Sequence, residues 1–361
     1  MAEELKNYRC PACGAPLVFD GESETLHCEF CDSSFSLKEM EERTDAVTGS
    51  DWGEAGAQWG RDGEKMRSYS CPGCGAVVVC DETTVATGCP YCGNPAVLLG
   101  PFRDQRRPDL VIPFKLTKED AVLRLQKHYQ GKFLLPQVFK EKNRIEKLQG
   151  VYVPFWLFDQ RAEGVMQFEA SNSTTRRSGD YLITDTSHYL VKRGGSMEFQ
   201  KIPVDGSKKM PDDYMDSIEP FDYEGLRAFS PAYLPGFLAD QYDVEAGEVM
   251  GRAEERCRSS MEDALRDTVW GYETVHVGMR RIALTHQNVK YALLPVWLLS
   301  TKWNGQNYLF AMNGQTGKLV GDLPVDRQKK RKTFLGLALG LSAVLCLLLS
   351  GPLAGLFARI M

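Results

Sequence analysis

The sequence lacks the short motifs that mark common enzyme chemistry. Its 361 residues contain no phosphate-binding G-x-x-x-x-G-K-[ST], no metalloprotease H-E-x-x-H, no G-x-S-x-G nucleophile elbow and no dinucleotide-binding G-x-G-x-x-G. The five histidines are scattered, and no two of them have the spacing of paired metal ligands. We therefore expect a protein without catalytic residues, not an enzyme.

A secretion signal and low-complexity tracts are also missing. The segment from Met1 to Arg9 is polar and acidic, so it lacks the apolar region of a cleavable signal peptide. The composition, 43% hydrophobic and 25% charged, is that of a folded globular chain and excludes a disordered one. The length allows two or three domains.

Basic residues are scarce in the N-terminal part of the chain. The formal net charge is −5, but residues 1–100 hold seven Lys and Arg against seventeen Asp and Glu, and the remainder carries +5. An acidic segment repels phosphate backbones. This distribution disfavours nucleic acid as a partner of the N-terminal part.

Cysteine, in contrast, is frequent and regularly spaced. Eight of the eleven cysteines form four C-x-x-C pairs, and the segment from Cys10 to Ala15 recurs without a gap 61 residues later as Cys71 to Ala76. Each copy reads C-x2-C-x14-C-x2-C, a spacing that lets two tight knuckles surround one ion with four thiolates. The pattern predicts two structural zinc ions, with iron or disulfides as alternatives. The ligands would be Cys10, Cys13, Cys28 and Cys31 in ribbon 1 (residues 1–40), and Cys71, Cys74, Cys89 and Cys92 in ribbon 2 (residues 67–100).

The residues around these cysteines fit such knuckles. Glycine follows the second cysteine of three pairs, as Gly14, Gly75 and Gly93, and permits a left-handed turn there; Asp32 takes the same place in the fourth. The three remaining cysteines, Cys80, Cys257 and Cys346, have no histidine nearby in the sequence. We assign Cys80 and Cys257 packing positions, place Cys346 in the expected membrane segment, and expect no nucleophilic role for any of them.

Residues 41–66 between the ribbons are polar and rich in glycine, which is typical of a linker. Trp52 and Trp59 are unusual in such a segment. They are either plain linker residues or residues that dock on a neighbouring surface.

Residues 101–325 have the mixed pattern of an α+β domain with antiparallel sheet units. Helices are predicted after Thr117 and over residues 244–269, where apolar residues recur every fourth position. Asn313 and Gly314 predict a turn. The predicted strands are Val151–Phe158, Tyr181–Val191, Val289–Leu299 and Tyr308–Met312.

Two of these runs resemble each other. Val153–Phe158 and Leu294–Leu299 share the order apolar, proline, apolar, tryptophan, which leaves an internal duplication open. The prolines predict a sheet edge or a bulge. Trp156 and Trp297 are core residues in the simpler interpretation, and the walls of a ligand pocket in the other.

The chain ends in an apolar run that predicts a membrane-spanning helix over residues 333–358. Gly336 and Gly340 form G-x-x-x-G, which permits close pairing of two helices, although glycine is common in membrane helices and coincidence is equally open. The segment 326–332 before the run carries five basic residues that suit an anionic lipid surface and predict cytoplasmic N-terminal domains and a single-pass location in the cell membrane. These residues are Arg327, Lys329, Lys330, Arg331 and Lys332.

Over nearly its whole length the chain resembles a family of bacterial membrane-anchored proteins with two zinc ribbons. The resemblance rests on the repeated C-P-x-C-G ribbon and on the segments Gly150–Asp159, Tyr233–Val244 and Asn313–Lys318 together with the tail. Such proteins are often labelled as TFIIB-type zinc ribbons or as relatives of the primosomal helicase, although the helicase phosphate loop is absent from this sequence. The resemblance implies an adaptor that works beside phage-shock-protein-A-like or flotillin-like (SPFH) partners in membrane stress, and it carries over no catalytic residue.

Two classes of function follow from these observations. The first is a membrane-tethered scaffold whose ribbons recruit cytosolic proteins, either as a single chain or as a homo-oligomer. The second is a membrane-associated factor of replication or transcription that binds nucleic acid. The acidic N-terminal part favours the first class, since ribbons that bind nucleic acid normally present a basic face.

Overall fold

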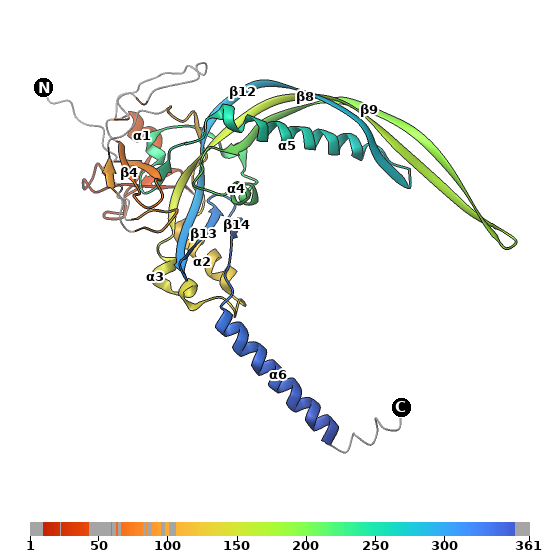
Figure 1. The fold of residues 1–361 in the computed structure, drawn as a ribbon. Helices are drawn as coiled ribbons and strands as arrows, with labels where there is room; N and C mark the ends of the chain where they lie inside the picture. The colour runs from red at the N-terminus through yellow and green to blue at the C-terminus, as the bar shows by residue number, and fades with distance from the viewer. Residues whose placement is uncertain are drawn as a thin grey trace.

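The computed structural model describes residues 10–21, 23–42, 59, 63, 66–81, 84, 88–94, 98–100 and 106–350. Figure 1 shows a body that contains both ribbons, a long curved arm that projects from it, and a helix, α6, that projects in another direction. The functional regions can be located relative to these three parts.

Ribbon 1 forms a small sheet of its own. Its three strands pair in the order β1-β2-β3, and a short helix follows them. These elements are β1 (Val18–Asp20), β2 (Thr25–His27), β3 (Ser34–Ser36) and α1 (Leu37–Glu42).

Ribbon 2 belongs to a much larger sheet of eleven strands. Eight of them follow the order β10-β7-β12-β8-β11-β5-β4-β6, while β9 pairs with β8, and β13 pairs with β12 and β14. From ribbon 2 come β4 (Met66–Ser70), β5 (Val77–Asp81) and β6 (Leu98–Gly100). The others are β7 (Leu110–Val111), β8 (Gln149–Ser178), β9 (Tyr181–Asp205), β10 (Arg227–Ala228), β11 (Leu238–Asp240), β12 (Thr274–Trp303), β13 (Gln306–Asn313) and β14 (Leu319–Gly321).

The helices start and end close to the predicted positions. The helix expected after Thr117 is α2, where Thr117 and Asp120 form a capping box, and the helix expected over 244–269 is α5. The five apolar positions of α5 that recur every fourth residue are buried. The helical elements are α2 (Lys118–Tyr129), η2 (Gln137–Lys140), α3 (Lys142–Ile145), α4 (Asp212–Ile218), η3 (Tyr223–Gly225), η4 (Pro231–Tyr233), α5 (Ala246–Asp267) and α6 (Arg327–Ser350).

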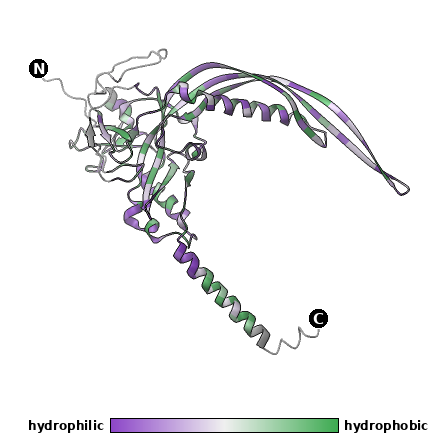
Figure 2. Cartoon of the chain, viewed as in Figure 1, coloured by the Kyte–Doolittle hydropathy of each residue, from purple (hydrophilic) through white to green (hydrophobic). Residues whose placement is uncertain are grey.

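The arm consists of β9, β8 and β12, in this order, with α5 along one face (Figure 1). Under the helix lies a separate apolar cluster that includes Met166, Phe168 and Met261. Strand β8 alternates between buried residues under α5 and exposed residues on the opposite face. Figure 2 shows alternating hydrophilic and hydrophobic bands along the arm. The predicted strands lie inside these elements, but β8 and β12 each extend to 30 residues, far beyond the apolar runs.

Two halves of the body repeat each other around the β8–β12 pair. In the first half β7, α2, β8 and β9 follow in sequence, and in the second half β11, α5, β12 and β13 follow in the same order. The carbonyl of Pro154 accepts a hydrogen bond from Gly206 N at 2.8 Å, and the carbonyl of Pro295 accepts one from Gly314 N at the same distance. The echo between the two sequence runs therefore coincides with equivalent places in the fold.

Both prolines lie in central strands, so the prediction of a sheet edge was wrong. Pro154 follows the residues of β8 that pair with β11 and precedes those that pair with β9; Pro295 occupies the equivalent place between β7 and β13. Proline is tolerated because one partner strand ends and the next begins at this position, so no backbone N–H is needed there.

The two tryptophans link the halves. Trp156 donates a hydrogen bond from Nε1 to the carbonyl of Val244, just before α5, and Trp297 donates one to the carbonyl of Leu116, just before α2. Each tryptophan therefore contacts the start of the other half's helix. Both are buried, which agrees with the core interpretation.

The prediction of a membrane-spanning helix over 333–358 was wrong. Among the residues that the structure describes, no helix is both long enough and apolar enough to cross a membrane. Within the described residues α6 runs over Arg327–Ser350 and its first two turns hold the five basic side chains, which leaves fewer than the roughly 20 apolar residues that a bilayer requires. The single-pass location and its orientation, which rested on this helix, are withdrawn with it; residues 351–361 lie outside the described part.

We expect Trp156→Phe and Trp297→Phe to destabilise the protein by similar amounts, about 1–2 kcal/mol each. Each change leaves a carbonyl without its donor, buried at Val244 and half-buried at Leu116, while keeping most of the ring. Urea unfolding of the two variants would measure this. Trp270→Phe serves as control, since Trp270 is 82% exposed and its replacement should change the unfolding free energy by less than about 0.5 kcal/mol. A large effect at only one of the two buried positions would contradict the equivalence of the halves.

Candidate metal centres

The first cysteine cluster lies in ribbon 1. The sulfur atoms of Cys10, Cys13, Cys28 and Cys31 all lie within 4.8 Å of one another. The Sγ atoms of Cys10 and Cys31 are 3.4 Å apart, and those of Cys13 and Cys28 are 3.5 Å apart. Cys10 and Cys28 are buried while Cys13 and Cys31 face solvent, so the cluster lies at the surface of the ribbon.

The second cluster repeats this arrangement in ribbon 2. Cys71, Cys74, Cys89 and Cys92 also lie within 4.8 Å of one another, and the Cys71–Cys92 and Cys74–Cys89 sulfur pairs are both 3.6 Å apart. Four thiolates bound tetrahedrally at 2.3 Å would be separated by roughly 3.8 Å. Both clusters therefore have the size and the ligand number of a four-cysteine metal site.

The backbone of all four knuckles supports this geometry. In each, the residue after the second cysteine donates its N–H to the carbonyl of the first cysteine, at 2.8–3.0 Å. The predicted left-handed conformation is confirmed at Gly14, Gly75 and Gly93 and also at Asp32, which has φ of 59°. The turns are thus formed by the chain itself and direct the sulfur pairs toward a common point.

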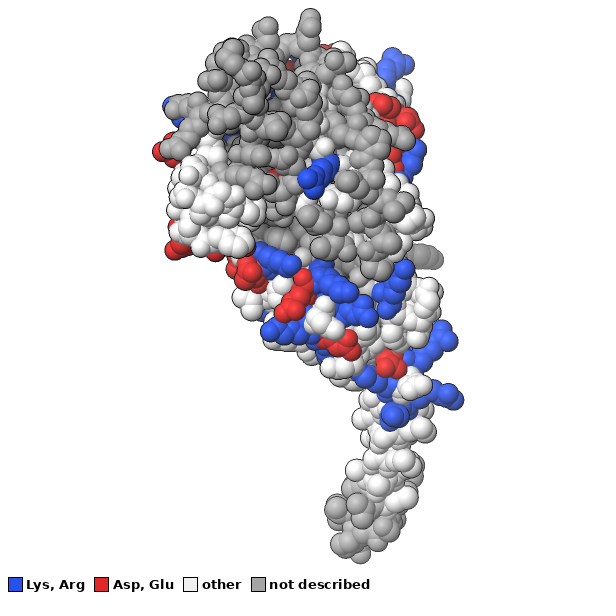
Figure 3. Space-filling model, turned by 90° about the vertical axis from the view of Figure 1, so that its left-hand side faces the viewer, with Lys and Arg blue, Asp and Glu red and all other residues white. Residues whose placement is uncertain are grey.

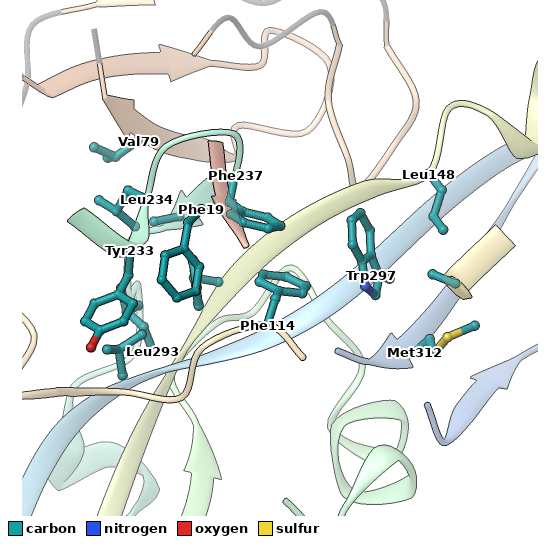
Figure 4. Close-up of a cluster of buried hydrophobic side chains, with 14 of the residues drawn as sticks. Phe19, Val79, Phe114, Leu148, Tyr233, Leu234, Phe237, Leu293, Trp297 and Met312 are labelled. Atoms are coloured by element: carbon teal, nitrogen blue, oxygen red, sulfur yellow. The ribbon is translucent and has the colours of Figure 1, made fainter. Parts of the chain in front are cut away.

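Ribbon 1 packs against the body through the end of β1. Phe19 N donates to the carbonyl of Pro235 at 3.2 Å, and the rings of Phe19 and Tyr233 meet edge to face at 5.1 Å. Figure 4 shows this contact continuing into the core around Phe114. The approach is close, since a Cβ atom on Gly21 would lie 1.1 Å from the carbonyl oxygen of Phe114.

Ribbon 2 is joined to the body through strand pairing. Val78 and Val79 of β5 pair with Asp240 and Ala239 of β11, which continues the large sheet into the ribbon. The knuckle itself contacts the far end of the sheet, where Asn307 Nδ2 donates to the carbonyl of Tyr91 at 2.9 Å.

A buried carboxylate lies next to this second knuckle. Asp240 Oδ2 accepts hydrogen bonds from the hydroxyls of Tyr91 and Ser207, both at 2.7 Å. Burial raises the pKa of Asp240 to about 7. No sequence motif marks these three residues as functional. Tyr91 sits between two ligands, which is a local signal, but Asp240 and Ser207 are distant in sequence and meet it only through the fold.

The other predicted residues lie elsewhere. Burial raises the pKa of Cys80 to about 12 and that of Cys257 to about 11, which fits packing positions and not reactive thiols. The basic residues 327–332 form the start of α6, where Lys329 Nζ donates to the carbonyl of Leu135 and helps to fix the helix to the body. Gly336 and Gly340 lie further along α6 and have open space beside them.

Of the two linker tryptophans, Trp59 is described and docks on the body. It is 8% exposed, and its ring meets that of Phe229 edge to face at 5.5 Å. Trp52 lies outside the described residues.

The fold and the clusters define a chain with two four-cysteine clusters, each able to hold a metal ion, attached to a large, sheet-rich domain. Among curated proteins, the Bacillus subtilis (strain 168) protein YdjG, itself described as uncharacterized, is 34% identical over 334 residues, which cover 92% of this chain and 94% of YdjG. The chain therefore belongs to the YdjG family. No protein-family profile and no solved structure matches it.

We expect the stability of the protein to fall as pH rises from about 4 to about 7 because of Asp240. Its pKa lies above the ordinary 3.8, so the folded state holds the proton more tightly than the unfolded state and loses this advantage on ionisation. Asp240→Asn cannot ionise. As pH rises through this interval, the free energy of unfolding of the variant should therefore increase relative to that of wild type by up to about 1.4 kcal/mol per pH unit.

Urea unfolding of both proteins at several pH values between 5 and 8, in the presence of metal, would test this. The difference between the two proteins isolates Asp240, because other groups titrate alike in both. A difference that stays constant over this range would contradict the assigned pKa.

Proposed function

We propose that this chain is a zinc-stabilised scaffold that binds other proteins and does no chemistry of its own. The observation that carries the proposal is the closed donor set of both centres. Each offers four cysteine sulfurs, which complete a tetrahedral shell and leave no position for water or substrate. Ions held in this way stabilise structure.

Zinc fits these centres best. Four thiolates in tetrahedral arrangement suit zinc or an iron–sulfur cluster, and the C-x-x-C knuckles with left-handed turns are typical of zinc ribbons. Four sulfurs within 4.8 Å of one another surround a single ion more readily than a cluster of several iron atoms.

The rest of the described surface also favours binding over catalysis. Two depressions beside β13, one lined by Tyr129 and Phe139 and the other by Tyr214 and Asn307, contain neither cysteine nor histidine. The arm presents a long, open sheet surface, and extended surfaces of this kind suit macromolecular partners.

The charge of the N-terminal part indicates the kind of partner. The first hundred residues carry a large excess of acidic side chains, which complements a basic protein face and raises the rate of association with it. The family resemblance described under the sequence makes phage-shock-protein-A-like and SPFH proteins the first candidates for this binding partner.

A second charged region lies away from the ribbons. Figure 3 shows lysines and arginines gathered at the foot of the body and the start of α6, with acidic residues among them.

Elemental analysis of the purified chain should find two zinc ions, and Cys13→Ser or Cys74→Ser should each lower this to one. Cys74→Ser should lower the thermal midpoint more than Cys13→Ser, because ribbon 2 continues the large sheet and contacts Asp240. Iron in place of zinc, or a single ion in wild type, would contradict the assignment.

A binding titration tests the scaffold. We expect the zinc-loaded full chain to bind a purified phage-shock-protein-A-like protein with micromolar affinity or better, and a 20-base-pair DNA duplex much more weakly. Raised salt should slow association with the protein partner, since their charges attract. Tight, salt-sensitive DNA binding without protein binding would instead assign the chain to the nucleic-acid class.

A matched pair of variants separates ribbon contacts from general charge. Glu29→Gln with Asp32→Asn removes two charges from exposed positions of ribbon 1 and keeps every ligand. Glu119→Gln with Glu141→Gln removes the same two negative charges from exposed positions of the body and is the control. Loss of affinity only in the first pair places the partner on the ribbon, and equal affinity in both would remove the ribbon from the interface.

A further inference from the structure

The outer edge of the arm, strand β9, carries exposed large hydrophobic residues, which is unusual for the edge of a sheet. Strand β9 pairs with β8 on one side, and on its other side it pairs with none of the described strands. Five large hydrophobic residues of β9 are exposed: Tyr181 (76%), Leu182 (74%), Ile183 (38%), Tyr189 (44%) and Leu190 (71%). Proteins usually protect such edges with charge, proline or a covering element, because an open apolar edge is a template for strand pairing.

This apolar character belongs to the edge and not to the arm in general. In the neighbouring strands the most exposed large hydrophobic residues are Val165 at 36% in β8, and Val277 and Met279 at 37% and 41% in β12. These three side chains are about half as exposed as Tyr181, Leu182 and Leu190 of β9, each of which exceeds 70%. The edge strand is therefore the surface that needs an explanation.

The distal part of the arm is also incomplete as a sheet. Pairing of β12 with β8 starts at Thr274 and Ser171, and beyond this point β8 and β9 continue alone to the pair Ser178 and Tyr181. Figure 1 shows this hairpin projecting clear of α5 and of the body. A two-stranded ribbon is marginally stable in water by itself, and additional strands stabilise it.

The sequence of the edge is symmetric about one residue. Three apolar residues, Tyr181–Ile183, are followed by five polar ones, Thr184–His188, and then by three apolar ones, Tyr189–Val191. The centre of this pattern is Thr186. A strand with such a pattern is complementary to itself when a second copy runs antiparallel to it, as a two-fold interface requires.

We propose that two copies of this chain associate by antiparallel pairing of their β9 edges, centred on Thr186. In this register Leu182 lies opposite Leu190 of the second copy and Ile183 opposite its Tyr189. Tyr181 lies opposite Val191, whose side chain is packed in the arm of its own copy. Asp180, just before the strand, lies opposite Lys192 and adds a pair of opposite charges at each end. The two hairpins then form a four-stranded sheet.

The geometry of the arm allows this pairing. In the antiparallel arrangement the body of each copy lies at an opposite end of the shared sheet, because β9 runs from the tip of the arm toward its own body. Two residues that lie opposite each other in this register, such as Leu182 and Leu190, are separated by an even number of positions in the sequence. Because side chains alternate between the two faces of a strand, both side chains of each pair lie on the same face of the shared sheet. The α5 helices of both copies are on the same face.

A second copy explains the edge better than the other candidate occupants. A strand from a different protein would need apolar residues on β9, but it would not need their mirror arrangement around Thr186. A lipid surface would contact the tip alone and would leave Tyr189 and Leu190, which lie well back along the strand, without a role.

Paired charge substitutions test the register. Leu182→Glu and Leu190→Lys should each weaken dimerisation of the zinc-loaded full chain at least about tenfold, measured by sedimentation over a concentration series. The double variant places the introduced glutamate of each copy opposite the introduced lysine of the other, so it should recover most of the lost affinity. Leu123→Lys, at a residue of α2 that is 62% exposed, is the control and should leave association unchanged.

Helix α6 also exposes apolar side chains, so dimerisation of the wild type could occur through α6 as well. The recovery of dimerisation in the double variant is the result that assigns the contact to β9. Single variants that associate like wild type, or a double variant weaker than both, would overturn the proposal.

Disulfide cross-linking tests independently whether the two-fold axis passes through Thr186. Residues opposite each other in antiparallel strands have Cα atoms about 4.5–5.5 Å apart, within the range of a disulfide. Thr186→Cys should therefore form a covalent dimer of the full chain on mild oxidation, beyond the background of the wild type. Thr184→Cys, whose opposite residue is His188, should not. Equal cross-linking of both variants would place the two-fold axis elsewhere or exclude it.

Discussion

The antiparallel pairing of β8 with β12 organises the rest of the molecule. It runs from Ser171 opposite Thr274 to Gln149 opposite Leu298, and both the arm and the body are built on it. On the outer side of β8 follow β9 and β11, and on the outer side of β12 follow β7 and β13. Ribbon 2 is added through β11, so a metal centre near the N-terminus depends on a strand pair from the middle of the chain.

The metal centres could be predicted from the sequence because their geometry is local. Each knuckle needs two cysteines, two residues between them and one residue in a left-handed turn, and Cys10, Cys13 and Gly14 show this directly. The start of α2 and the buried stripe of α5 could be predicted for the same reason, since capping and helical periodicity act within a few residues.

The arm and the position of ribbon 2 could not be predicted in this way. The buried face of the outer part of β8 places Ala162 and Gly164 beside Met166 and Phe168, so it gives no continuous hydrophobic run. Their burial comes from α5, which lies about a hundred residues further along the chain. The prediction for the tail was wrong because its apolar composition indicates a membrane helix, whereas α6 starts earlier, at Arg327, and includes the five basic residues.

The exchanged tryptophans make the two halves interdependent. Each half has a carbonyl at the entrance of its helix, buried at Val244 and half-buried at Leu116, and the donor for that carbonyl comes from the opposite half. The short strands β7 and β11 likewise pair in parallel with the long strand of the opposite half. A chain cut in the loop after β9 would give two fragments, neither of which could satisfy its own interior. The halves are thus complementary pieces of one folding unit. A change at the entrance of the helix in one half alters a hydrogen bond of the tryptophan in the long strand of the other half.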